Sequence, residues 1–164
     1  MHFYLGNSQL NLKQFPEAIA TYNTLAQKYP QFKNLDAARY NLAMARFQIA
    51  NGSNKPEDFQ AAAKAFEEII AKHPQSPYVA RAYYYLGDAR YVAQDVAGAA
   101  EAYRQLVEKF PDSNLTADAL YYLGVAQQEL EKTEEAAATY EKFLKTPAYA
   151  KHELASEIRL RQGI

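Results

Sequence analysis

The sequence predicts an all-α protein, a right-handed superhelical solenoid built from helix hairpins. Two observations predict this fold class. The 164 residues include thirty alanines but only 6 glycines and 7 prolines, and this composition favours tightly packed helices over a sheet because alanine is the best helix former. In addition, a short pattern of leucine, small residue, alanine, aromatic residue and proline recurs along the chain, which is the signature of a repeat architecture.

Four leucines, each followed by glycine or alanine, recur at spacings of 37, 44 and 37 residues: Leu5, Leu42, Leu86 and Leu123. A tyrosine stands seventeen residues after the first, third and fourth of them, at Tyr22, Tyr103 and Tyr140. In the second copy the aromatic comes seven residues later, as Phe66. A small residue lets two helices approach closely, and the leucine and the aromatic ring fill the space between them. Each unit is therefore predicted to be a helix hairpin.

The first two repeats are expected over residues 1–33 and 34–77. The first holds helices at 1–12 and 16–29, and Pro16 stands where a first helical turn loses nothing by lacking an N–H group. The second holds helices at 34–50 and 56–72, and the latter begins at Pro56 and ends before Pro74. Its seven additional residues fall within 51–58, where Asn, Gly and Ser predict an exposed loop.

The third and fourth repeats are expected over residues 78–114 and 115–148. Their helices are predicted at 77–93 and 96–109, then at 114–130 and 134–145, with Thr133 as the N-cap of the last. Residues 149–164 are interpreted as a partial fifth repeat with a helix at 148–161. We expect one domain over residues 1–164, and a segment of a longer solenoid whose ends expose apolar residues such as Leu5, Ile158 and Leu160.

Composition excludes several classes of function. The 18 basic residues are balanced by 19 acidic ones, so there is no basic excess to neutralise phosphates and nucleic acid is not an expected partner. Charged or amide residues interrupt every apolar stretch before it reaches the roughly 20 residues that a bilayer requires, so no membrane insertion of this segment is expected. The chain has no cysteine, which excludes disulfides and thiolate metal sites.

No catalytic constellation is recognisable. The three histidines, His2, His73 and His152, lie about 70 to 80 residues apart, which is not a metal-ligand spacing. There is no glycine-rich phosphate loop and no nucleophile elbow. Adjacent carboxylates such as Glu67 and Glu68 point about 100 degrees apart on a helix and do not share a proton. We therefore expect no enzyme activity, no cofactor and no metal.

With catalysis not expected, the remaining candidate for a functional site is a binding surface. First helices line the concave side of a hairpin solenoid, and positions two before, two after and five after each repeat leucine share one helical face. An aromatic residue recurs on this face once per repeat. Arg81 is expected near the start of the first helix of the third repeat. Tyrosine combines an apolar ring with a polar tip, which suits an interface. The candidate partner-binding residues are Tyr40, Met44, Phe47, Arg81, Tyr84, Tyr85, Asp88, Tyr91, Tyr121, Tyr122 and Gln128. The alternative is that these rings fill the space between neighbouring first helices.

The leucine-glycine pairs, the alanine four residues before each aromatic and the closing prolines together resemble the tetratricopeptide repeat family over nearly the whole chain. The resemblance implies a non-catalytic scaffold that binds a protein or peptide segment. The family's carboxylate clamp needs lysine where this chain has Phe3, Tyr40, Tyr84 and Tyr121, so a cochaperone role is not expected. The junctions around Pro30, Pro74 and Pro111 are similar to a bacterial envelope subgroup that includes the Tol-Pal coordinator protein and the barrel-assembly lipoprotein. That similarity implies a periplasmic or envelope location and a role in envelope assembly or division, and a cytoplasmic location is the alternative.

Two other functions stay open at this point. The chain could be a self-associating architectural spacer whose exposed ends stack weakly on other copies, or a regulatory segment of a larger protein. Sedimentation separates the first from a peptide adapter, because a spacer shows a mass that depends on concentration whereas an adapter stays monomeric until its partner is added.

Overall fold

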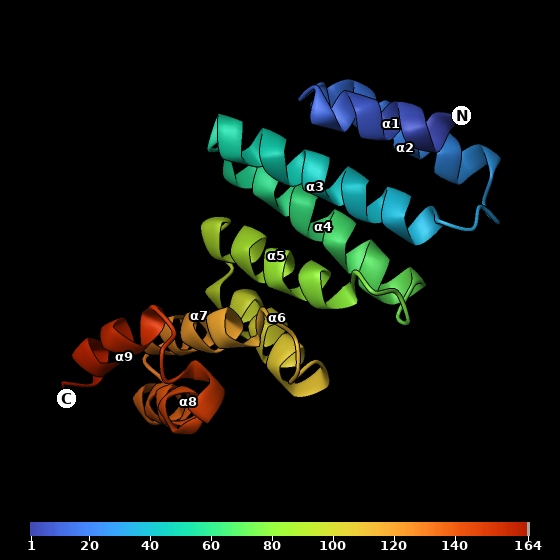
Figure 1. Cartoon of the computed structure of the whole chain (residues 1–164). Helices are drawn as coiled ribbons and strands as arrows, with labels where there is room; N and C mark the ends of the chain where they lie inside the picture. Colours follow the sequence, from blue (N-terminus) through green and yellow to red (C-terminus); the bar gives the residue numbers. More distant parts are fainter. Residues whose placement is uncertain (164) are drawn as a thin grey trace. The chain divides into compact units, whose positions relative to one another are not determined.

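The protein is described here by a computed structural model that covers residues 1–163 and is built of helices over that range. The helices divide into two compact units, Met1–Gln94 and a second that begins at Asp95. The division falls in the turn between two helices. Each unit is considered by itself below, with the helix labels of Figure 1.

The first unit contains five helices that follow the expected order. They are α1 (His2–Asn11), α2 (Phe15–Lys28), α3 (Leu35–Ser53), α4 (Pro56–Lys72) and α5 (Val79–Val92). Consecutive helices pack on one another, α1 on α2 and then α2 on α3, α3 on α4 and α4 on α5 (Figure 1). In addition, α1 contacts α3 directly. First helices of neighbouring repeats therefore lie beside one another, as in a stack of hairpins.

Between residues 95 and 163 the second unit contains four α-helices and a short 3-10 turn. They are α6 (Val96–Lys109), α7 (Thr116–Glu129), α8 (Thr133–Lys145), the turn Pro147–Tyr149 and α9 (Leu154–Gln162). The predicted single helix over 148–161 is wrong for residues 148–153, because Pro147 opens a 3-10 turn and the chain bends again before α9 begins. Thr133 is the first residue of α8 and not its cap, and its side chain makes no capping hydrogen bond.

The predicted close approach at the glycine positions is confirmed in both units. A Cβ atom built on Gly6 would lie 2.6 Å from Cε1 of Tyr22, and one built on Gly124 would lie 2.3 Å from Cε1 of Tyr140. Both tyrosine rings are buried, with 1% of their surface exposed. The glycine on the first helix therefore makes room for the aromatic ring of the second helix, which fixes how closely the two helices of a hairpin pack.

Residues 51–58 are mostly exposed, as expected, but they do not form the expected loop. Residues 51–53 continue α3 and Pro56 already begins α4, so only Asn54 and Lys55 connect them. Ser53 donates a hydrogen bond from its Oγ to Oδ2 of Asp58 at 2.5 Å, across this connection.

The seven additional residues lengthen both helices of the second hairpin. Every hairpin turn contains one residue with positive φ: Lys13, Asn54, Gln94 and Glu131. In the first, third and fourth repeats this residue lies eight positions after the repeat leucine and nine positions before the repeat aromatic. In the second repeat both intervals are twelve positions. The insertion thus adds four residues to α3 and three to α4. Each addition is close to one helical turn of 3.6 residues, which preserves the packing faces.

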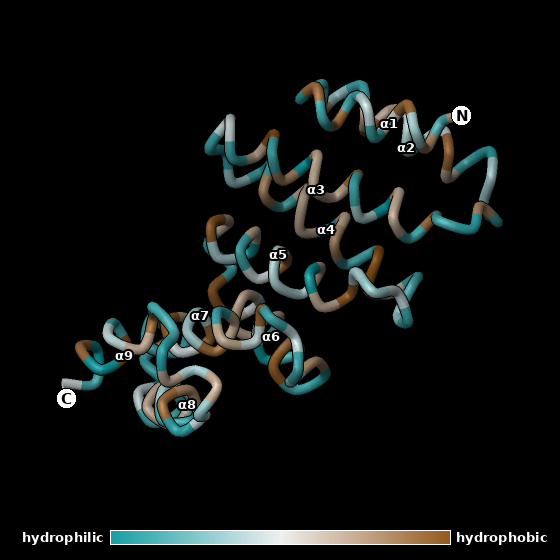
Figure 2. The backbone as a smooth tube through the Cα atoms, viewed as in Figure 1, coloured by the Kyte–Doolittle hydropathy of each residue, from teal (hydrophilic) through white to brown (hydrophobic). Residues whose placement is uncertain are grey.

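The apolar residues expected at the chain ends are only partly exposed. Leu5 and Leu160 keep 48% and 75% of their surface exposed, as expected, but Ile158 is completely buried where α9 packs on α8. Figure 2 shows apolar and polar residues interspersed along the helices rather than collected in long apolar blocks. Consistent with this, no helix within residues 1–163 has the length and apolar character to cross a bilayer.

The junctions after three of the second helices, α2, α4 and α6, share one backbone geometry. The C-cap residues of α2, α4 and α6 are Tyr29, His73 and Phe110, with φ between −132° and −136° and ψ between 57° and 65°. His73 therefore occupies a position that holds a six-membered aromatic ring, Tyr29 or Phe110, at the other two junctions. Burial, and then the nearby charge of Arg39, lower the pKa of His73 below its usual 6.5, and its Nε2 atom is buried without a hydrogen-bond partner.

We expect the substitution His73→Phe to make stability less dependent on pH. The unfolded histidine takes up a proton near pH 6.5 whereas the folded one resists it, so the wild-type protein loses stability as the pH falls from above 6.5 through the lowered folded pKa. Phenylalanine has no proton to bind. The gain in unfolding free energy of His73→Phe over wild type should be larger at about pH 5 than at about pH 8 in urea melts. Parallel pH profiles for the two proteins would contradict this assignment.

Candidate functional surface

The repeated hairpins place the predicted binding residues on first helices. In the first unit these residues belong to α3 and α5, and in the second unit to α7. The structure brings some of them together, but in two different ways. Some pack into the space between neighbouring helices and others stay partly open to solvent.

Tyr40 and Phe47 belong to the core, contrary to the expectation of an exposed aromatic ladder. Their exposed fractions are 8% and 9%. The ring of Tyr40 stacks on Tyr78 at a centroid distance of 4.8 Å, and the ring of Phe47 meets Tyr85 edge-on at 5.4 Å. Because α3 lies between two neighbouring hairpins, aromatic rings on this face fill the gap toward the next helix. For these two residues the space-filling alternative is therefore correct.

Burial also changes the chemistry of Tyr40. It raises the pKa of the phenol to about 12, and the nearby guanidinium of Arg81 acts in the opposite direction. Arg81 itself is exposed on α5. The Tyr40 hydroxyl therefore stays protonated at every physiological pH, and Arg81 carries the charge of this part of the surface.

Tyr85 is a packing residue that connects repeats. It stacks on Phe66, the aromatic of the preceding second helix, at 5.8 Å and 18°. The same position, one before the repeat leucine, plays the same part elsewhere: Asn41 on α3 lies 3.4 Å from the Tyr22 hydroxyl, and Tyr122 on α7 stacks on Tyr103 at 5.8 Å. The side chain at this position therefore contacts the repeat aromatic of the hairpin before it.

Five predicted residues of the first unit keep partial exposure. They are Met44 on α3 and Tyr84, Tyr85, Asp88 and Tyr91 on α5. The ring of Tyr84 stands against Tyr85 at 5.5 Å and 87°, in an edge-to-face contact. Leu86, two residues further along α5, is 4% exposed. As expected, then, Leu86 is buried while Tyr84 is not. By contrast Leu42 of α3 is only half-buried.

In the second unit a side chain from α9 contacts two of the predicted residues of α7, Tyr121 and Gln128. The guanidinium carbon of Arg161 lies 5.6 Å from the centroid of the Tyr121 ring, and Arg161 Nη1 donates to Oε1 of Gln128 at 3.4 Å. Oε1 of Gln128 also accepts a 2.8 Å hydrogen bond from the Tyr140 hydroxyl, whose pKa burial raises to about 12. A 3.0 Å ion pair with Glu157 orients Arg161. Tyr121 and Gln128 are therefore partly engaged by the protein's own last helix.

The structure also shows polar contacts inside the hairpins that sequence reasoning missed. Thr21 donates a hydrogen bond to Gln9 in the first unit, and Thr139 donates one to Gln127 in the second, both at 2.7 Å. Each pair joins the two helices of one hairpin at the same register. The signal was present in the sequence, since both threonines immediately precede the repeat tyrosine and both glutamines follow the repeat glycine by three.

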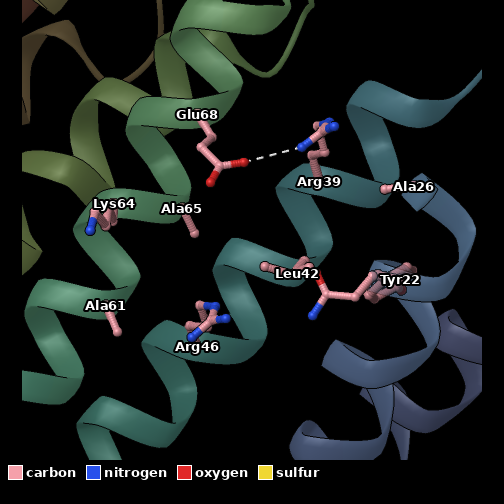
Figure 3. Close-up of a pocket in the computed structure, with 10 residues that line it drawn as sticks. Tyr22, Ala26, Arg39, Leu42, Arg46, Ala61, Lys64, Ala65 and Glu68 are labelled. Carbon is pink, nitrogen blue, oxygen red and sulfur yellow. Dashed lines mark hydrogen bonds and ion pairs between the residues drawn. The ribbon is translucent and has the colours of Figure 1, made fainter. Parts of the chain in front are cut away.

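A hollow on the other side of the first unit was missed as well. It lies between the second helices α2 and α4, above Leu42, and encloses about 180 Å³. Arg39, Arg46 and Lys64 line it together with Glu68 (Figure 3). Among residues 1–163 no group of His, Asp or Glu side chains is arranged to hold a metal ion.

Comparisons with known proteins agree with the hairpin geometry. Two family profiles described as tetratricopeptide repeat match the chain, one over residues 57–114 and the other over residues 2–31, 37–76 and 118–147. A search among curated proteins finds no match.

Several solved structures share the fold. A crystal structure of MamA is 20% identical, with 99% of this chain and 81% of that chain covered and a TM-score of 0.73. MamA residues 41 to the end from Desulfovibrio magneticus RS-1 are 20% identical, with 86% and 71% covered and a TM-score of 0.64. A putative kinesin light chain from Podosopora anserina with nearly identical TPR-like repeats is 19% identical, with 99% and 85% covered and a TM-score of 0.67. Likeness at this level of identity concerns the fold, and it confirms the predicted class.

Proposed function

Because the chain belongs to the tetratricopeptide repeat family, we propose that it is a non-catalytic scaffold that binds a segment of a partner protein along its first helices. The family assignment makes it a protein–protein interaction scaffold by class. What we propose beyond that class is which surface binds, which kind of segment it binds and which residues make the contacts. An envelope location is likewise proposed from the resemblance of the repeat junctions alone.

The proposed surface is narrower than the sequence pattern suggests. Since Tyr40 and Phe47 are buried and Tyr85 is used in packing, the residues that can contact a partner in the first unit are Met44, Arg81, Tyr84, Asp88 and Tyr91. The observation that carries the proposal is the contrast on α5, where Leu86 is buried and Tyr84 remains partly exposed. The Tyr84 ring is backed by Tyr85, so it loses little conformational freedom when a partner covers it. An exposed arginine beside a tyrosine is a combination enriched at interfaces.

A peptide segment, extended or helical, suits this surface. The apolar contact offered by Met44 and Tyr84 would accept one or two anchoring side chains, and Arg81 would orient the segment by its charge. Met44 is suited to such a role because its flexible thioether adapts to differently shaped neighbours. The arrangement offers no group that would react with the bound segment.

We expect Tyr84→Ala to weaken partner binding by about 1 kcal/mol or more, roughly a fivefold rise in Kd, because interface aromatics typically contribute that much. Peptides selected from a random library on the immobilised protein would be titrated against wild type and variant by fluorescence anisotropy. The matched control is Tyr29→Ala, which removes an exposed tyrosine (52% exposed) at the end of α2. Equal loss of binding in both variants, or none in Tyr84→Ala, would contradict the proposed surface.

A second candidate function, self-association, is favoured by the exposed apolar residues of α1. Tyr4, Leu5 and Leu12 keep 74%, 48% and 70% of their surface exposed. In the interior repeats the residue at the position of Tyr4 contacts the aromatic of the preceding hairpin, so Tyr4 would contact an equivalent hairpin of another copy. Sedimentation velocity over a hundredfold range of protein concentration tests this function. A constant monomer mass would exclude it and leave the peptide-binding proposal untouched.

A further inference from the structure

We propose that the hollow above Leu42, on the side of the second helices, is a second binding site that takes a carboxylate side chain and its apolar neighbour from an acidic segment of a partner protein. This site uses none of the first-helix residues of the surface proposed above. Variants of the hollow and variants of the first-helix surface can therefore test the two proposed sites independently.

The shape of the hollow follows from small residues on its walls. Ala26 of α2 and Ala61 and Ala65 of α4 line it, with Leu42 of α3 between them. Alanine side chains leave space between the two second helices, and the hollow of about 180 Å³ that results can hold a carboxylate side chain with part of its apolar neighbour. Leu42, which is only half-buried, supplies an apolar surface there.

The charge of the hollow is strongly unbalanced for a chain whose net charge is −1. Three basic side chains, Arg39, Arg46 and Lys64, face a single acidic one, Glu68. Glu68 is already neutralised, because its Oε2 lies 3.1 Å from Arg39 Nη1 and 3.2 Å from Lys72 Nζ. In the part of the chain that the structure describes, neither Arg46 nor Lys64 makes an ion pair or a side-chain hydrogen bond, and Figure 3 shows both side chains beside the hollow.

A buried donor in the same cluster also lacks an acceptor. Arg39 has 21% of its side chain exposed, yet its Nε atom is buried and has no hydrogen-bond partner. Leaving a buried donor unpaired lowers stability, and more so when the group is charged. An acceptor that entered the hollow from a partner would relieve this cost, and a carboxylate is the acceptor that a guanidinium group matches best.

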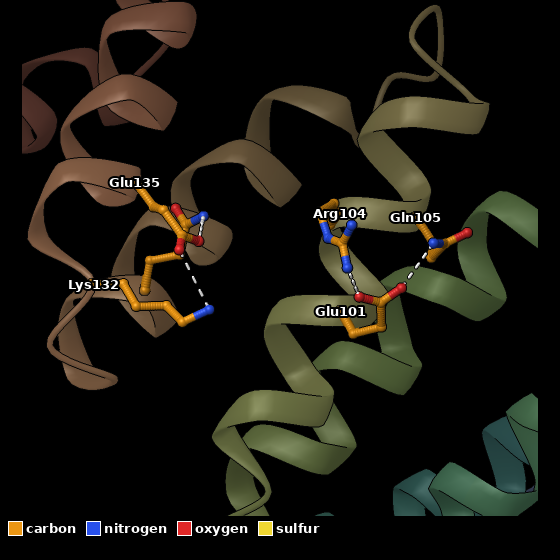
Figure 4. A network of polar contacts seen from close by, with 6 residues as sticks. Glu101, Arg104, Gln105, Lys132 and Glu135 are labelled. Carbon is orange, nitrogen blue, oxygen red and sulfur yellow. Dashed lines mark hydrogen bonds and ion pairs between the residues drawn. The ribbon is translucent and has the colours of Figure 1, made fainter.

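The corresponding hollow in the second unit shows that this charge is not a general property of the repeat. It lies above Leu123, and all three basic residues are replaced at the equivalent positions. Its remaining charges are paired internally: Arg104 with Glu101, and Lys132 with Glu135 at 3.4 Å (Figure 4). The replacements of Arg39, Arg46 and Lys64 are Leu120, Gln127 and Ala138. Of these two hollows, only that of the first unit holds basic side chains without an ion pair, Arg46 and Lys64.

The apolar part of the hollow favours an acidic protein segment over a free anion. A phosphate ion would satisfy the basic groups but leave Leu42 and the alanines in water. A glutamate next to leucine in a peptide satisfies both, and burying the leucine adds favourable apolar contact at roughly 25 cal/mol per Å². Arg39 already holds a carboxylate, that of Glu68, at the edge of the same hollow.

The proposal can be tested with the isotope-labelled full chain and three probes. The first is an acetylated and amidated pentapeptide of alternating leucine and glutamate, the second is the same peptide with glutamine in place of glutamate, and the third is inorganic phosphate. We expect only the first to shift the amide signals of residues around Leu42, Arg46 and Ala61. The effect should weaken when salt is raised from about 50 to 300 mM, because the interaction is between charges near the surface.

Variants separate the site from a general charge effect. Arg46→Gln with Lys64→Gln should raise the Kd of the acidic peptide about tenfold or more. The matched control, Lys142→Gln with Arg159→Gln, removes two positive charges from exposed positions of the second unit and should leave the Kd within about twofold, as should Tyr84→Ala. Ala61→Phe fills the hollow without changing its charge and should abolish binding, which keeps the test decisive if the double variant does not fold.

Three outcomes would overturn the proposal. One is equal loss of binding in the two double variants, which would mean a nonspecific charge effect. Another is retained binding in Ala61→Phe, which would place the peptide elsewhere. The third is a shift of the same amide signals by phosphate but not by the acidic peptide, which would make the hollow a site for small anions.

Discussion

Replacing Phe66 with alanine is expected to lower the unfolding free energy of the first unit by about 3–5 kcal/mol, the range observed for large-to-small changes of buried aromatics. Phe66 is completely buried. Its ring lies 5.8 Å from Tyr85 and 6.3 Å from both Tyr40 and Phe47. The substitution removes the one side chain that these three rings share, so collapse of the neighbours around the cavity would leave some of them poorly packed.

Urea unfolding followed by circular dichroism measures this loss, and Phe66→Leu is its control. Leucine keeps most of the apolar volume and should cost less than half as much. A second readout is independent of stability, since burial is what raises the pKa of Tyr40 to about 12. In Phe66→Ala that pKa should move back toward 10, as seen by tyrosine absorbance during alkaline titration. A stability change below about 1 kcal/mol would show that the aromatic cluster does not hold the second and third repeats together.

Gly124→Ala is expected to destabilise the second unit by about 3 kcal/mol, at the upper end of the usual cost of overpacking. The added methyl group would lie 2.3 Å from the Tyr140 ring. That ring cannot move aside easily, because it is buried and its hydroxyl donates to Gln128. The two helices of the hairpin would have to separate, and contacts along their length would weaken.

Gly52→Ala is the matched control, since no atom lies within 4 Å of the added methyl group in the last turn of α3. It should stabilise the protein by roughly 0.5–1 kcal/mol, because glycine loses more conformational freedom than alanine on forming a helix. A second change, Gly124→Ala with Tyr140→Leu, should recover part of the loss by removing the ring. Destabilisation of similar size in Gly52→Ala and Gly124→Ala would show that the effect is one of helix propensity and not of overlap.

The division between binding and packing aromatics could not be predicted from helical periodicity. Tyr40 and Tyr84 occupy the same position relative to their repeat leucines, yet Tyr40 is buried against Tyr78 whereas Tyr84 is partly exposed. Periodicity says which side of its own helix a residue occupies. It does not say which side chain the next helix brings toward that residue.

The seven-residue insertion illustrates the same limit at the level of secondary structure. Its Asn, Gly and Ser residues are typical of loops, but in the structure most of it is helical. The two extra turns, one on each helix, extend the hairpin beyond the contact between Phe47 and Phe59 at 5.9 Å, and a hydrogen bond from Ser53 to Asp58 joins them. Packing of an apolar face contributes more to helix stability than intrinsic propensity does, so local composition was a poor guide here.

By itself the sequence determined the repeat, the hairpins and the family. These depend on local spacing: a glycine or alanine on one helix, an aromatic seventeen or twenty-four residues after the repeat leucine, and a proline that ends the second helix. Only the tertiary structure decided which charges and rings remain available. Arg46 and Lys64 come from different helices and meet only above Leu42, and Arg161 reaches Tyr121 only because α9 packs back on α7 and α8. Such contacts depend on the angles and distances at which helices pack. They join side chains far apart in the sequence, so the local sequence around each residue does not predict them.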